Sequence, residues 1–445
     1  MKTGYSPLLT DRYQLTMLQA YWQHGMHETA VFEFFVRKLP AQRSFLLAAG
    51  LEQALAYLEE FAFPPDDIEW LAQTQVFQPG FLRWLEDMRF TGDVNAMPEG
   101  TAFFAEEPIL QVIAPLPEAQ LVETRLINLL NFQTAIASKA VRSVLVASGK
   151  LLVEFGLRRS QGAEAALMAA RASYIAGFDG TSNVLAGKLF NIPLFGTMAH
   201  SFIQAHDDEI AAFENFADAN SGDIVLLIDT YDTEAAAIKV AHLAAALKER
   251  SIKIKGVRID SGDLGKHAAS VRAILDAARL HDVTIFASGN LDEYALRDLV
   301  GSGAPIDGFG LGTRLDTSSD APYLDCAYKL QEYAGRPRRK RSEGKTTWPG
   351  CKQVYRKLDS SNRLESDFLT FRRETLAAEA LLIPVMRSGK RLADPQPLPA
   401  LRRHTASQLA QLPDRLRTLA TSEPFKVTVS SSLRECARAL DLENS

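Results

Sequence analysis

Hydrophobic and polar residues follow a changing rhythm along the chain, and this rhythm predicts the order of helices and strands. Near the amino end, residues 30–39 (AVFEFFVRKL) alternate as in a strand, and residues 51–63 (LEQALAYLEEFAF) have the spacing of an amphipathic helix. A longer helical pattern covers residues 121–141 and is interpreted as the connection to a second region. Residues 1–125 are therefore predicted to form an N-terminal α/β domain.

From about residue 150, short apolar runs alternate with helical segments. The runs expected to form strands are residues 151–157, 192–198, 224–229, 252–260, 283–288 and 306–312. The last four begin roughly 25 to 30 residues apart, the length of a strand–helix unit in a parallel sheet. A barrel and an open doubly wound sheet both fit this rhythm. Residues 126–330 are predicted to form this domain and to carry the active site.

The third region, residues 331–445, begins with the most basic stretch of the chain, residues 336–345 (RPRRKRSEGK). Such a stretch is either a solvated face or a lid that grips phosphate, and both interpretations stay open. The rest of the region is mixed in pattern. It is expected to pack on the other two regions and to fray at its polar end.

Composition and charge exclude several classes of protein. Of the 445 residues, 47% are hydrophobic and the net charge is −5, which argues against a general nucleic-acid binder. No stretch is apolar enough to predict a membrane span or a secretory signal. Cys326, Cys351 and Cys436 are too widely spaced for a disulfide framework or a structural zinc site. We expect a cytoplasmic protein without a protein-bound metal.

Polar groups end each apolar run of the second region. In chain order they are Arg158 and Arg159; Thr197 and His200; Asp229 and Asp232; Arg258, Asp260 and Asp263; Ser288, Gly289 and Asn290; Gly312 and Thr313. Ligands of parallel α/β folds bind at the carboxyl ends of the strands, so these groups are expected to converge on one site. This series favours the barrel over the open sheet.

Two of these clusters are glycine-rich turns, residues 288–290 (SGN) and 310–313 (GLGT). Either turn alone is typical of a tight strand-to-helix connection. Together, on consecutive predicted strands, they favour a phosphate cradle built from backbone N–H groups.

Three residues are candidates for the chemistry itself. His200 lies in a glycine-containing turn (FGTMAHSF) and is either a structural histidine or a nucleophile or acid–base group. Arg258 and Asp260 share one face of a strand end. They form either an internal ion pair or a site in which Arg258 grips a substrate carboxylate and Asp260 accepts from ribose hydroxyls.

Taken in order, these segments resemble the nicotinate phosphoribosyltransferase family. The matching segments are LLTDRYQLTM (8–17), FEFFVRKLP (32–40), EFGLRRSQG (154–162), FDGTSNVLAG (178–187), GTMAHSF (196–202), RIDSGDL (258–264), FASGNLDE (286–293), GFGLGTRL (308–315), and SEGK followed by PGCKQVYR (342–356). The resemblance covers residues 5 to 360. It implies an irregular, TIM-like α/β barrel beside an open-faced α/β (α+β) domain built mainly from the N-terminal region.

The resemblance also implies an enzyme of the salvage route to NAD. The pyridine nitrogen of nicotinate would attack C1 of phosphoribosyl pyrophosphate and expel pyrophosphate, forming nicotinate mononucleotide. ATP would be a co-substrate through a phosphohistidine at His200, and Mg²⁺ would ride on the pyrophosphate. The enzyme would be a homodimer with shared active sites.

For the nicotinate site, the resemblance implies that Arg258 binds the carboxylate and Thr197 helps to seat the ring. Phe155 would stack on one face of the ring and Tyr13 of the partner subunit on the other. Ser182 favours nicotinate, since nicotinamide-using relatives carry an aspartate there that would repel a carboxylate.

For the sugar donor, Arg158 and Arg159 would hold pyrophosphate oxygens and Asp260 would bind ribose hydroxyls. The groups expected to cradle the 5′-phosphate are Ser288, Gly289, Gly312 and Thr313. His200, Arg258 and Asp260 would be the catalytic residues. The rival functions are a nicotinamide phosphoribosyltransferase and a nucleotide-binding relative without catalytic activity.

Overall fold

The computed structural model describes residues 6–220 and 222–443. Contacts divide the chain into two units, one of residues 1–138 and 321–445 and the other of residues 139–320. The carboxyl-terminal region thus belongs to the same unit as the amino-terminal region. The three sequence regions with boundaries near residues 125 and 330 stay a prediction.

The first unit is built on a seven-stranded antiparallel sheet. Its strands, in spatial order, are β13 (Arg336–Pro337), β12 (Cys326–Tyr333), β1 (Thr29–Val36), β5 (Pro108–Pro115), β3 (Asp93–Ala96), β17 (Ile383–Arg387) and β18 (Lys390–Arg391). The strand predicted at residues 30–39 corresponds to β1. Every residue of β1 after Thr29 is buried, because both faces of this central strand are covered. Aromatic and β-branched residues suit such a position.

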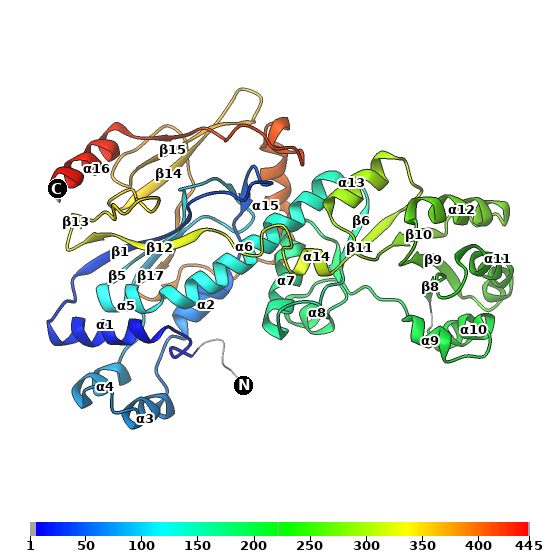
Figure 1. Cartoon of the computed structure of the whole chain (residues 1–445), viewed down its shortest axis with the longest axis horizontal. Helices are drawn as coiled ribbons and strands as arrows, with labels where there is room; N and C mark the ends of the chain where they lie inside the picture. Colours follow the sequence, from blue (N-terminus) through cyan, green and yellow to red (C-terminus); the bar gives the residue numbers. More distant parts are fainter. Residues whose placement is uncertain (1–5, 221, 444–445) are drawn as a thin grey trace. The chain divides into compact units, whose positions relative to one another are not determined.

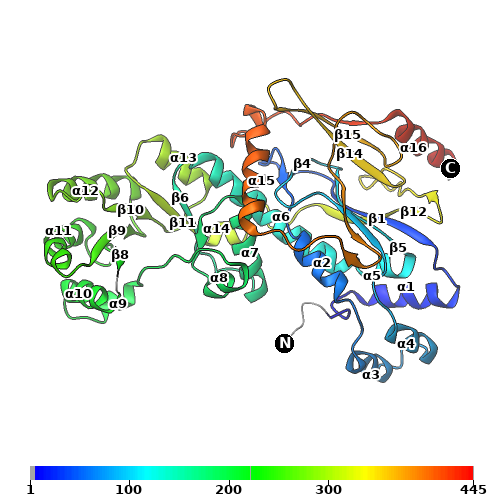
Figure 2. The ribbon, with the colours of Figure 1, turned by 180° about the vertical axis from the view of Figure 1, so that it is seen from behind.

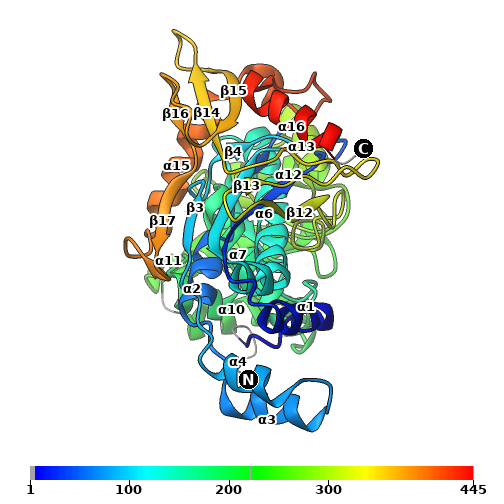
Figure 3. The same ribbon diagram turned by 90° about the vertical axis from the view of Figure 1, so that its left-hand side faces the viewer.

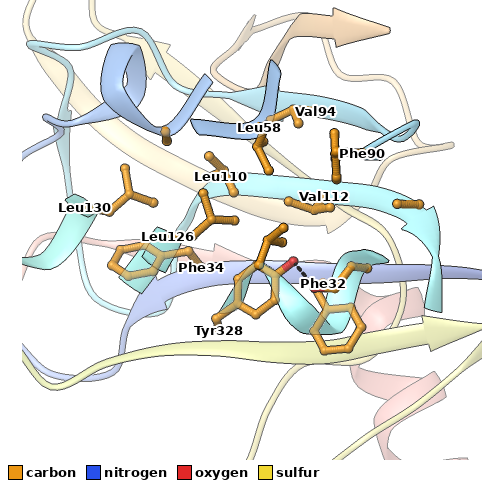
Figure 4. Close-up of a cluster of buried hydrophobic side chains, with 14 of the residues drawn as sticks. Phe32, Phe34, Leu58, Phe90, Val94, Leu110, Val112, Leu126, Leu130 and Tyr328 are labelled. Carbon is orange, nitrogen blue, oxygen red and sulfur yellow. Dashed lines mark hydrogen bonds between the residues drawn. The ribbon is translucent and has the colours of Figure 1, made fainter. Parts of the chain in front are cut away.

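The core of the first unit lies against this sheet (Figure 4). Phe32 of β1 and Tyr328 of β12 stack with ring centroids 5.0 Å apart and planes 14° apart. The Tyr328 hydroxyl donates to the carbonyl oxygen of Ala119 at 2.8 Å. Complete burial raises the pKa of Tyr328 well above its ordinary value. The phenol therefore stays neutral. Its ring adds buried apolar area to the core, and its hydroxyl group has a hydrogen-bond partner there.

Two smaller sheets complete the first unit. The four-stranded sheet has the order β16 (Glu379–Ala380), β14 (Lys352–Leu358), β15 (Leu364–Phe371) and β19 (Val427–Val429), and the two-stranded sheet consists of β2 (Leu46–Leu47) and β4 (Ala102–Phe103). The fully buried ion pair between Arg356 and Asp367, 2.6 Å long, joins β14 to β15. Figure 3 shows β14, β15 and β16 together, with α15 and α16 nearby.

The first unit also contains several helices. They are α1 (Arg12–Gln23), α2 (Leu51–Glu59), α3 (Pro65–Gln73), α4 (Pro79–Glu86), α5 (Leu116–Leu121), α15 (Leu398–Gln411), the 3₁₀-helix η2 (Asp414–Leu416) and α16 (Ser431–Glu443). The polar end that was expected to fray is α16, whose Leu433 and Ala437 are buried. These two residues are four positions apart, so they lie on the same face of α16, and this face packs against the rest of the unit.

The second unit contains a six-stranded parallel sheet (Figure 1). Its order is β7 (Gly180–Thr181), β6 (Leu151–Glu154), β11 (Gly308–Leu311), β10 (Thr284–Ala287), β9 (Lys253–Ile259) and β8 (Asp223–Leu227). The sheet curls as a half-barrel, which confirms the predicted fold class. Every strand pair is parallel, so the carboxyl ends of the strands meet at one edge.

The helices of this unit follow the strands in the predicted rhythm. They are α7 (Ala163–Ala176), α8 (Val184–Phe190), α9 (His200–Gln204), α10 (Glu209–Ala219), α11 (Thr233–Glu249), α12 (Leu264–Ala277), α13 (Glu293–Gly301) and α14 (Thr313–Asp316). α11 and α12 pack on each other and on β9 (Figure 2). The long helix predicted at residues 121–141 is α6 (Glu123–Val146), which runs from the first unit into the second.

One expected strand is almost absent. Of residues 192–198, only Leu194 pairs with a strand, through an isolated parallel bridge to Thr181. The remaining residues form an extended connection to α9 that contains Pro193 and Gly196. Proline cannot donate to a ladder and glycine weakens one, so an apolar run of this composition does not extend the sheet.

No described helix is both long and apolar enough to cross a membrane. Cys326, Cys351 and Cys436 are all free thiols.

Candidate active site

The predicted site residues of the second unit lie at the carboxyl ends of its parallel strands. Phe155 follows β6, Ser182 follows β7, Ser288 follows β10 and Gly312 follows β11. Arg258 lies near the end of β9, and Asp260 directly follows this strand. Thr197 and His200 reach this edge from the connection after Leu194. Residues that are far apart in the sequence thus lie at one edge of the sheet, because all of its strands are parallel.

Arg258 is the centre of a hydrogen-bond network at this edge. Its Nε donates to Ser288 Oγ at 2.8 Å, its Nη1 to Thr197 Oγ1 at 3.2 Å and its Nη2 to Asp260 Oδ1 at 2.6 Å. Its Cζ lies 5.5 Å from the centroid of the Phe155 ring. These bonds use three of the N–H groups of the guanidinium. The side chain is therefore held in one orientation and still has N–H groups to offer a ligand.

Asp260 is held as a carboxylate by its neighbours. Burial raises the pKa of Asp260, but the hydrogen bond from Ser288 and the charge of Arg258 outweigh it, so the pKa lies below its ordinary value. The ion pair between Arg258 and Asp260, one of the two interpretations that the sequence allowed, is therefore present. It orients Asp260 without enclosing it, because 30% of its side chain remains exposed.

His200 begins α9 and faces two carboxylates. Its Nε2 lies 3.9 Å from Asp229 Oδ1 and 3.9 Å from Asp260 Oδ2. Its Nδ1 lies 3.2 Å from the hydroxyl oxygen of Thr230. With 40% of its side chain exposed, the imidazole is accessible as well as oriented. This is not the environment of a histidine that only fills a core.

Asp229 was expected at this edge without a particular role, and Thr230 was not singled out in the sequence. The Asp229 side chain is 1% exposed, and its Oδ2 accepts from the backbone N of Asp260 at 2.9 Å and from Ser261 Oγ at 2.5 Å. Its Oδ1 accepts no hydrogen bond from any described residue and is the atom that faces His200. The available signal was the position of Asp229 directly after the apolar run of β8.

Two other carboxylates of the strand ends are helix caps. Asp232 accepts from the backbone N of Ala235 at 2.7 Å, and Asp263 accepts from the backbone N of Lys266 at 3.1 Å. Each satisfies an N–H group in the first turn of the helix that follows, α11 or α12. One oxygen of each carboxylate thus caps a helix, and the expectation that these two residues also join the ligand site stays a prediction.

The two predicted phosphate turns lie on β10 and β11, which are neighbours in the sheet. Gly289 has a φ of +98°, and a Cβ there would stand 2.0 Å from the carbonyl oxygen of Asp260. A Cβ on Gly312 would stand 2.9 Å from the carbonyl oxygen of Phe155. Both turns therefore require glycine because the backbone of the adjacent strand end is too close for a side chain.

Arg314 connects these turns. Its Nε donates to Asn290 Oδ1 at 3.1 Å, and its guanidinium forms an ion pair with Asp292. Asp292 also caps α13, whose first residues follow the SGN turn. Thr313, at the start of α14, directly precedes Arg314. Arg314 thus links the two turns that are predicted to bind phosphate and fixes their positions relative to each other.

The other predicted ligand groups lie outside the Arg258 network. Arg158 and Arg159 are exposed in the turn after β6. Ser182 is half-buried after β7, and its backbone N donates to the carbonyl oxygen of Glu154 at 2.9 Å. Tyr13 lies on α1 of the other unit, 50% exposed. Its hydroxyl accepts from the side chain of its neighbour in α1 at 3.0 Å.

The basic stretch at residues 336–345 is tied to α16. Arg339 pairs with Asp441 at 2.6 Å and lies over the ring of Trp348, with Cζ 5.9 Å from the ring centroid. Arg341 donates to the backbone carbonyl oxygen of Asp441 at 2.8 Å. These contacts favour the structural interpretation of the stretch.

Among the described residues, no group of three or more histidine, cysteine or acidic side chains is arranged to hold a metal ion. Asp229 Oδ1 and Asp260 Oδ2 nevertheless present two carboxylate oxygens on the same side as His200. Hard cations bind such oxygens when phosphates or waters supply the other ligands. The arrangement fits a cation that arrives with a phosphorylated substrate.

A curled parallel sheet with an arginine, a histidine, two carboxylates and two glycine turns at its carboxyl edge is typical of an α/β enzyme that binds a small anionic ligand. Family models match three successive parts of the chain. They describe the nicotinate phosphoribosyltransferase N-terminal domain (residues 8–131), the nicotinate phosphoribosyltransferase family (residues 151–335) and its C-terminal domain (residues 374–437).

Individual relatives agree. The chain is 48% identical over 428 residues to the nicotinate phosphoribosyltransferase pncB2 of Mycobacterium tuberculosis, covering 96% of this chain and 92% of the relative. It is 42% identical to the nicotinate phosphoribosyltransferase of Bacillus subtilis, covering 81% and 75% of the two chains. The crystal structure of human nicotinic acid phosphoribosyltransferase superimposes with a TM-score of 0.88 at 30% identity, covering 97% and 99%.

The chain belongs to the nicotinate phosphoribosyltransferase family. The predicted family and the prediction of a transferase enzyme are confirmed.

Proposed function

We propose that this chain joins nicotinate to the phosphoribosyl group of phosphoribosyl pyrophosphate, coupled to the hydrolysis of ATP. The observation that carries the proposal is the Arg258 network, which brings Asp260, Ser288 and Thr197 from three separate segments to one cation. In the reaction, the pyridine nitrogen forms a bond to C1 of the ribose while the bond from C1 to the pyrophosphate oxygen breaks. The products are nicotinate mononucleotide and pyrophosphate.

Nicotinate is proposed to bind between Phe155 and Arg258. The N–H groups of Arg258 that its network does not use would bind the carboxylate, and the Phe155 ring would stack on the pyridine. Thr197 would orient the ring from the side, since its hydroxyl already contacts the guanidinium. Ser182 supports a carboxylate substrate because it brings no negative charge to the site.

The sugar donor is proposed to lie along the strand ends. Asp260 would accept from ribose hydroxyls, and Arg158 and Arg159 would hold the pyrophosphate. The 5′-phosphate would be bound by the turns containing Ser288, Gly289, Gly312 and Thr313. As pyrophosphate leaves, the ribosyl C1 gains oxocarbenium character, so positioning and fixed charges can supply most of the rate enhancement.

His200 is proposed to be phosphorylated by ATP. Asp229 and Asp260 face Nε2 and favour a proton there, which leaves the lone pair on Nδ1. Nδ1 would attack the γ-phosphorus of ATP, breaking its bond to the bridging oxygen and releasing ADP. Water would later cleave the phosphorus–nitrogen bond, returning neutral histidine and inorganic phosphate. The phosphohistidine would add negative charge next to Asp260 and reorganise the groups around the sugar donor.

Mg²⁺ bound to the substrate phosphates would neutralise the charge that develops on the leaving pyrophosphate. Asp229 Oδ1 and Asp260 Oδ2 are the protein oxygens that fit such a complex. Their role would be to orient the phosphates relative to His200.

A homodimer with shared active sites is part of the proposal. Exposed apolar side chains support an interface: Val184 (69%), Leu185 (51%) and Leu189 (56%) all lie on α8. On the other unit, Tyr13 (50%) and Trp70 (56%) are also exposed. Such clusters mark interaction surfaces. In this arrangement Tyr13 of the partner subunit would cover the nicotinate ring opposite Phe155. A cytoplasmic location stays a prediction from the sequence.

The test is the release of pyrophosphate from phosphoribosyl pyrophosphate by purified protein, with nicotinate or nicotinamide and with or without ATP. We expect release only with nicotinate and faster release with ATP. Preference for nicotinamide would support the rival transferase. Binding of phosphoribosyl pyrophosphate without turnover on either base would support the non-catalytic relative.

A further inference from the structure

Two buried carboxyl groups lie beneath the strand ends, outside the Arg258 network. Glu154 is the last residue of β6 and Asp316 is the last residue of α14. Both side chains are completely buried, and the two carboxyl groups are close enough for each to shift the pKa of the other. In the described part of the chain neither carboxyl forms an ion pair with a cation. Two negative charges in such a position would be prohibitively costly, so one proton must be retained between them.

The donors around the pair indicate which group keeps the proton. Glu154 Oε1 accepts from the backbone N of Gly156, and Glu154 Oε2 accepts from the hydroxyl of Thr181. Asp316 Oδ2 accepts from Ser160 Oγ at 2.5 Å, whereas Asp316 Oδ1 receives no donor from the described residues. Glu154 is thus surrounded by donors, as an ionised carboxylate requires. Asp316 is surrounded by fewer donors, as suits an acid that donates its own proton.

The pKa shifts agree with this distribution. Burial, followed by the charge of Glu154, raises the pKa of Asp316 well above its ordinary value. Burial also raises the pKa of Glu154, but the hydrogen bonds from Thr181, Gly156 and Asp316 oppose that effect. The acid with fewer external donors is therefore the one that is harder to ionise.

The charged groups on the neighbouring elements do not neutralise the pair. Arg158 and Arg159 are exposed in the turn after β6. Arg314 of α14 is engaged with Asn290 and Asp292. Arg171 of α7 is buried but contributes to neither pKa shift.

We propose that Glu154 and Asp316 share one proton, carried on Asp316, and that this acid–carboxylate pair is a positioning element for the sugar-donor site. The pair joins the end of β6 and the turn of residues 156–160 to α14. The contact is close: a Cβ on Gly156 would stand 2.1 Å from Asp316 Cγ. Asp316 is the last residue of α14 and Thr313 is its first, so a single helical turn separates the two residues.

The inference rests on the proposed function, because the joined segments carry the groups proposed to bind the phosphates of the sugar donor. Arg158 and Arg159 belong to the turn held by Gly156 and Ser160. Gly312 and Thr313 open the helix that ends in Asp316. Loss of the shared proton would separate the pyrophosphate side of the site from the 5′-phosphate side. Nicotinate contacts at Arg258 would be affected less, because that residue lies on β9.

Two matched substitutions distinguish the proposed proton position. Asp316→Asn replaces the acid O–H by an amide N–H that donates to Glu154 in the same way, and its amide oxygen still accepts from Ser160. Glu154→Gln instead places an NH₂ group among donors, so at least one buried donor loses its acceptor. Asp316→Leu removes the hydrogen bonds and keeps a branched side chain of larger volume. Thermal unfolding of each variant would show which of them fold.

Binding of phosphoribosyl pyrophosphate with Mg²⁺, measured by calorimetry, is the first readout. We expect the affinity of Asp316→Asn to stay within about threefold of the wild type, and that of Glu154→Gln and Asp316→Leu to fall by about tenfold or more. Nicotinate affinity should change less than donor affinity in every folded variant. Equal losses in Asp316→Asn and Glu154→Gln, or unchanged donor affinity in Asp316→Leu, would overturn the proposal.

Infrared difference spectra between the wild type and Asp316→Asn provide a readout that does not depend on substrate or turnover. The wild type should show the carbonyl stretch of a protonated carboxylic acid that Asp316→Asn lacks. If that band is absent, the shared proton is disproved even if the enzyme is active. If the band is present and the wild type binds no phosphoribosyl pyrophosphate, the proposed function fails while the proton assignment stands.

Discussion

Gly289 lies directly against Asp260: a Cβ on this glycine would stand 2.0 Å from the Asp260 carbonyl oxygen. The turn after β10 and the end of β9 are therefore in backbone contact at the point where Asp260 leaves the sheet. With its φ of +98°, Gly289 also occupies a region that other residues rarely adopt. The closeness of the SGN turn to Asp260, the carboxylate proposed to be catalytic, depends on this glycine.

Gly289→Ala is expected to weaken binding of the sugar donor and to lower stability. The backbone strain alone costs about 1–3 kcal/mol, and relieving the clash must move the turn away from Asp260. The KM for phosphoribosyl pyrophosphate and the thermal midpoint would show both effects. Gly301→Ala is the matched control, since no atom lies within 4 Å of a Cβ there. Equal behaviour of the two variants would contradict the proposed phosphate turn.

Arg258→Lys is expected to weaken nicotinate binding by about 1–3 kcal/mol, because lysine keeps the charge but loses the planar fork that binds a carboxylate in two places. Arg272→Lys is the control: Arg272 also makes three hydrogen bonds, but to groups of its own helix and the following connection. Steady-state kinetics with nicotinate would separate them. An unchanged KM for nicotinate in Arg258→Lys would move the carboxylate site elsewhere.

Ser182→Asp is expected to impair the use of nicotinate more than that of nicotinamide, since the new carboxylate repels only the charged substrate. The ratio of kcat/KM for the two bases measures the effect. Ser201→Asp, which adds the same charge next to His200, is a control for non-specific damage. A proportional loss with both bases would show that Ser182 does not face the substrate carboxylate.

His200→Asn is expected to abolish ATP stimulation and labelling by γ-phosphate-labelled ATP. Slow synthesis without ATP is expected to survive, because pyrophosphate is itself a good leaving group. His206→Asn is the matched control, since the His206 ring already bonds the carbonyl oxygen of Phe202 at 2.8 Å. Wild-type labelling of His200→Asn would disprove the assignment.

The Arg258–Asp260 pair predicts a pH dependence of stability. Burial raises the pKa of Asp260, but Ser288 and Arg258 bring it below its ordinary value. A lowered folded-state pKa means that ionised Asp260 stabilises the fold above its ordinary pKa, and that this contribution disappears as the pH falls through the folded-state pKa. The difference in free energy of unfolding between the wild type and Asp260→Asn should therefore be constant near neutral pH and change only below about pH 4. A change confined to alkaline pH would contradict the sign.

Substitution of Tyr13 tests the proposal that the active site is shared between two subunits. Losing its ring is expected to weaken nicotinate binding by about 0.5–1.5 kcal/mol beyond the loss of buried area. Mixing Tyr13→Ala with His200→Ala subunits should restore ATP-coupled activity in some heterodimers, where one site receives both intact residues. Subunit exchange must be demonstrated independently, for example by mass spectrometry. Full ATP-coupled activity in a monomer, or no recovery after proven exchange, would contradict the shared site.

The sequence by itself determined the order of the strand–helix units and most of the candidate site. Residues such as Ser288 and Gly312 could be found because the carboxyl end of a parallel strand is visible in the local sequence. It is an apolar run followed by a turn of small or polar residues. Residues 192–198 show the limit of this signal, since their apolar pattern forms only one isolated bridge. Pattern alone also assigned the same significance to Asp229 and Asp232.

The tertiary structure decided what these residues contact. Asp232 caps a helix, whereas Asp229 turns a partly unbonded carboxylate toward His200. No pattern in the sequence connects Glu154 with Asp316, yet in the folded chain both are buried and each contributes to the pKa shift of the other. Hydrophobic periodicity depends on near neighbours and is therefore visible in the chain. The partner of a buried polar group depends on which distant segments pack together, so only the folded structure decides it.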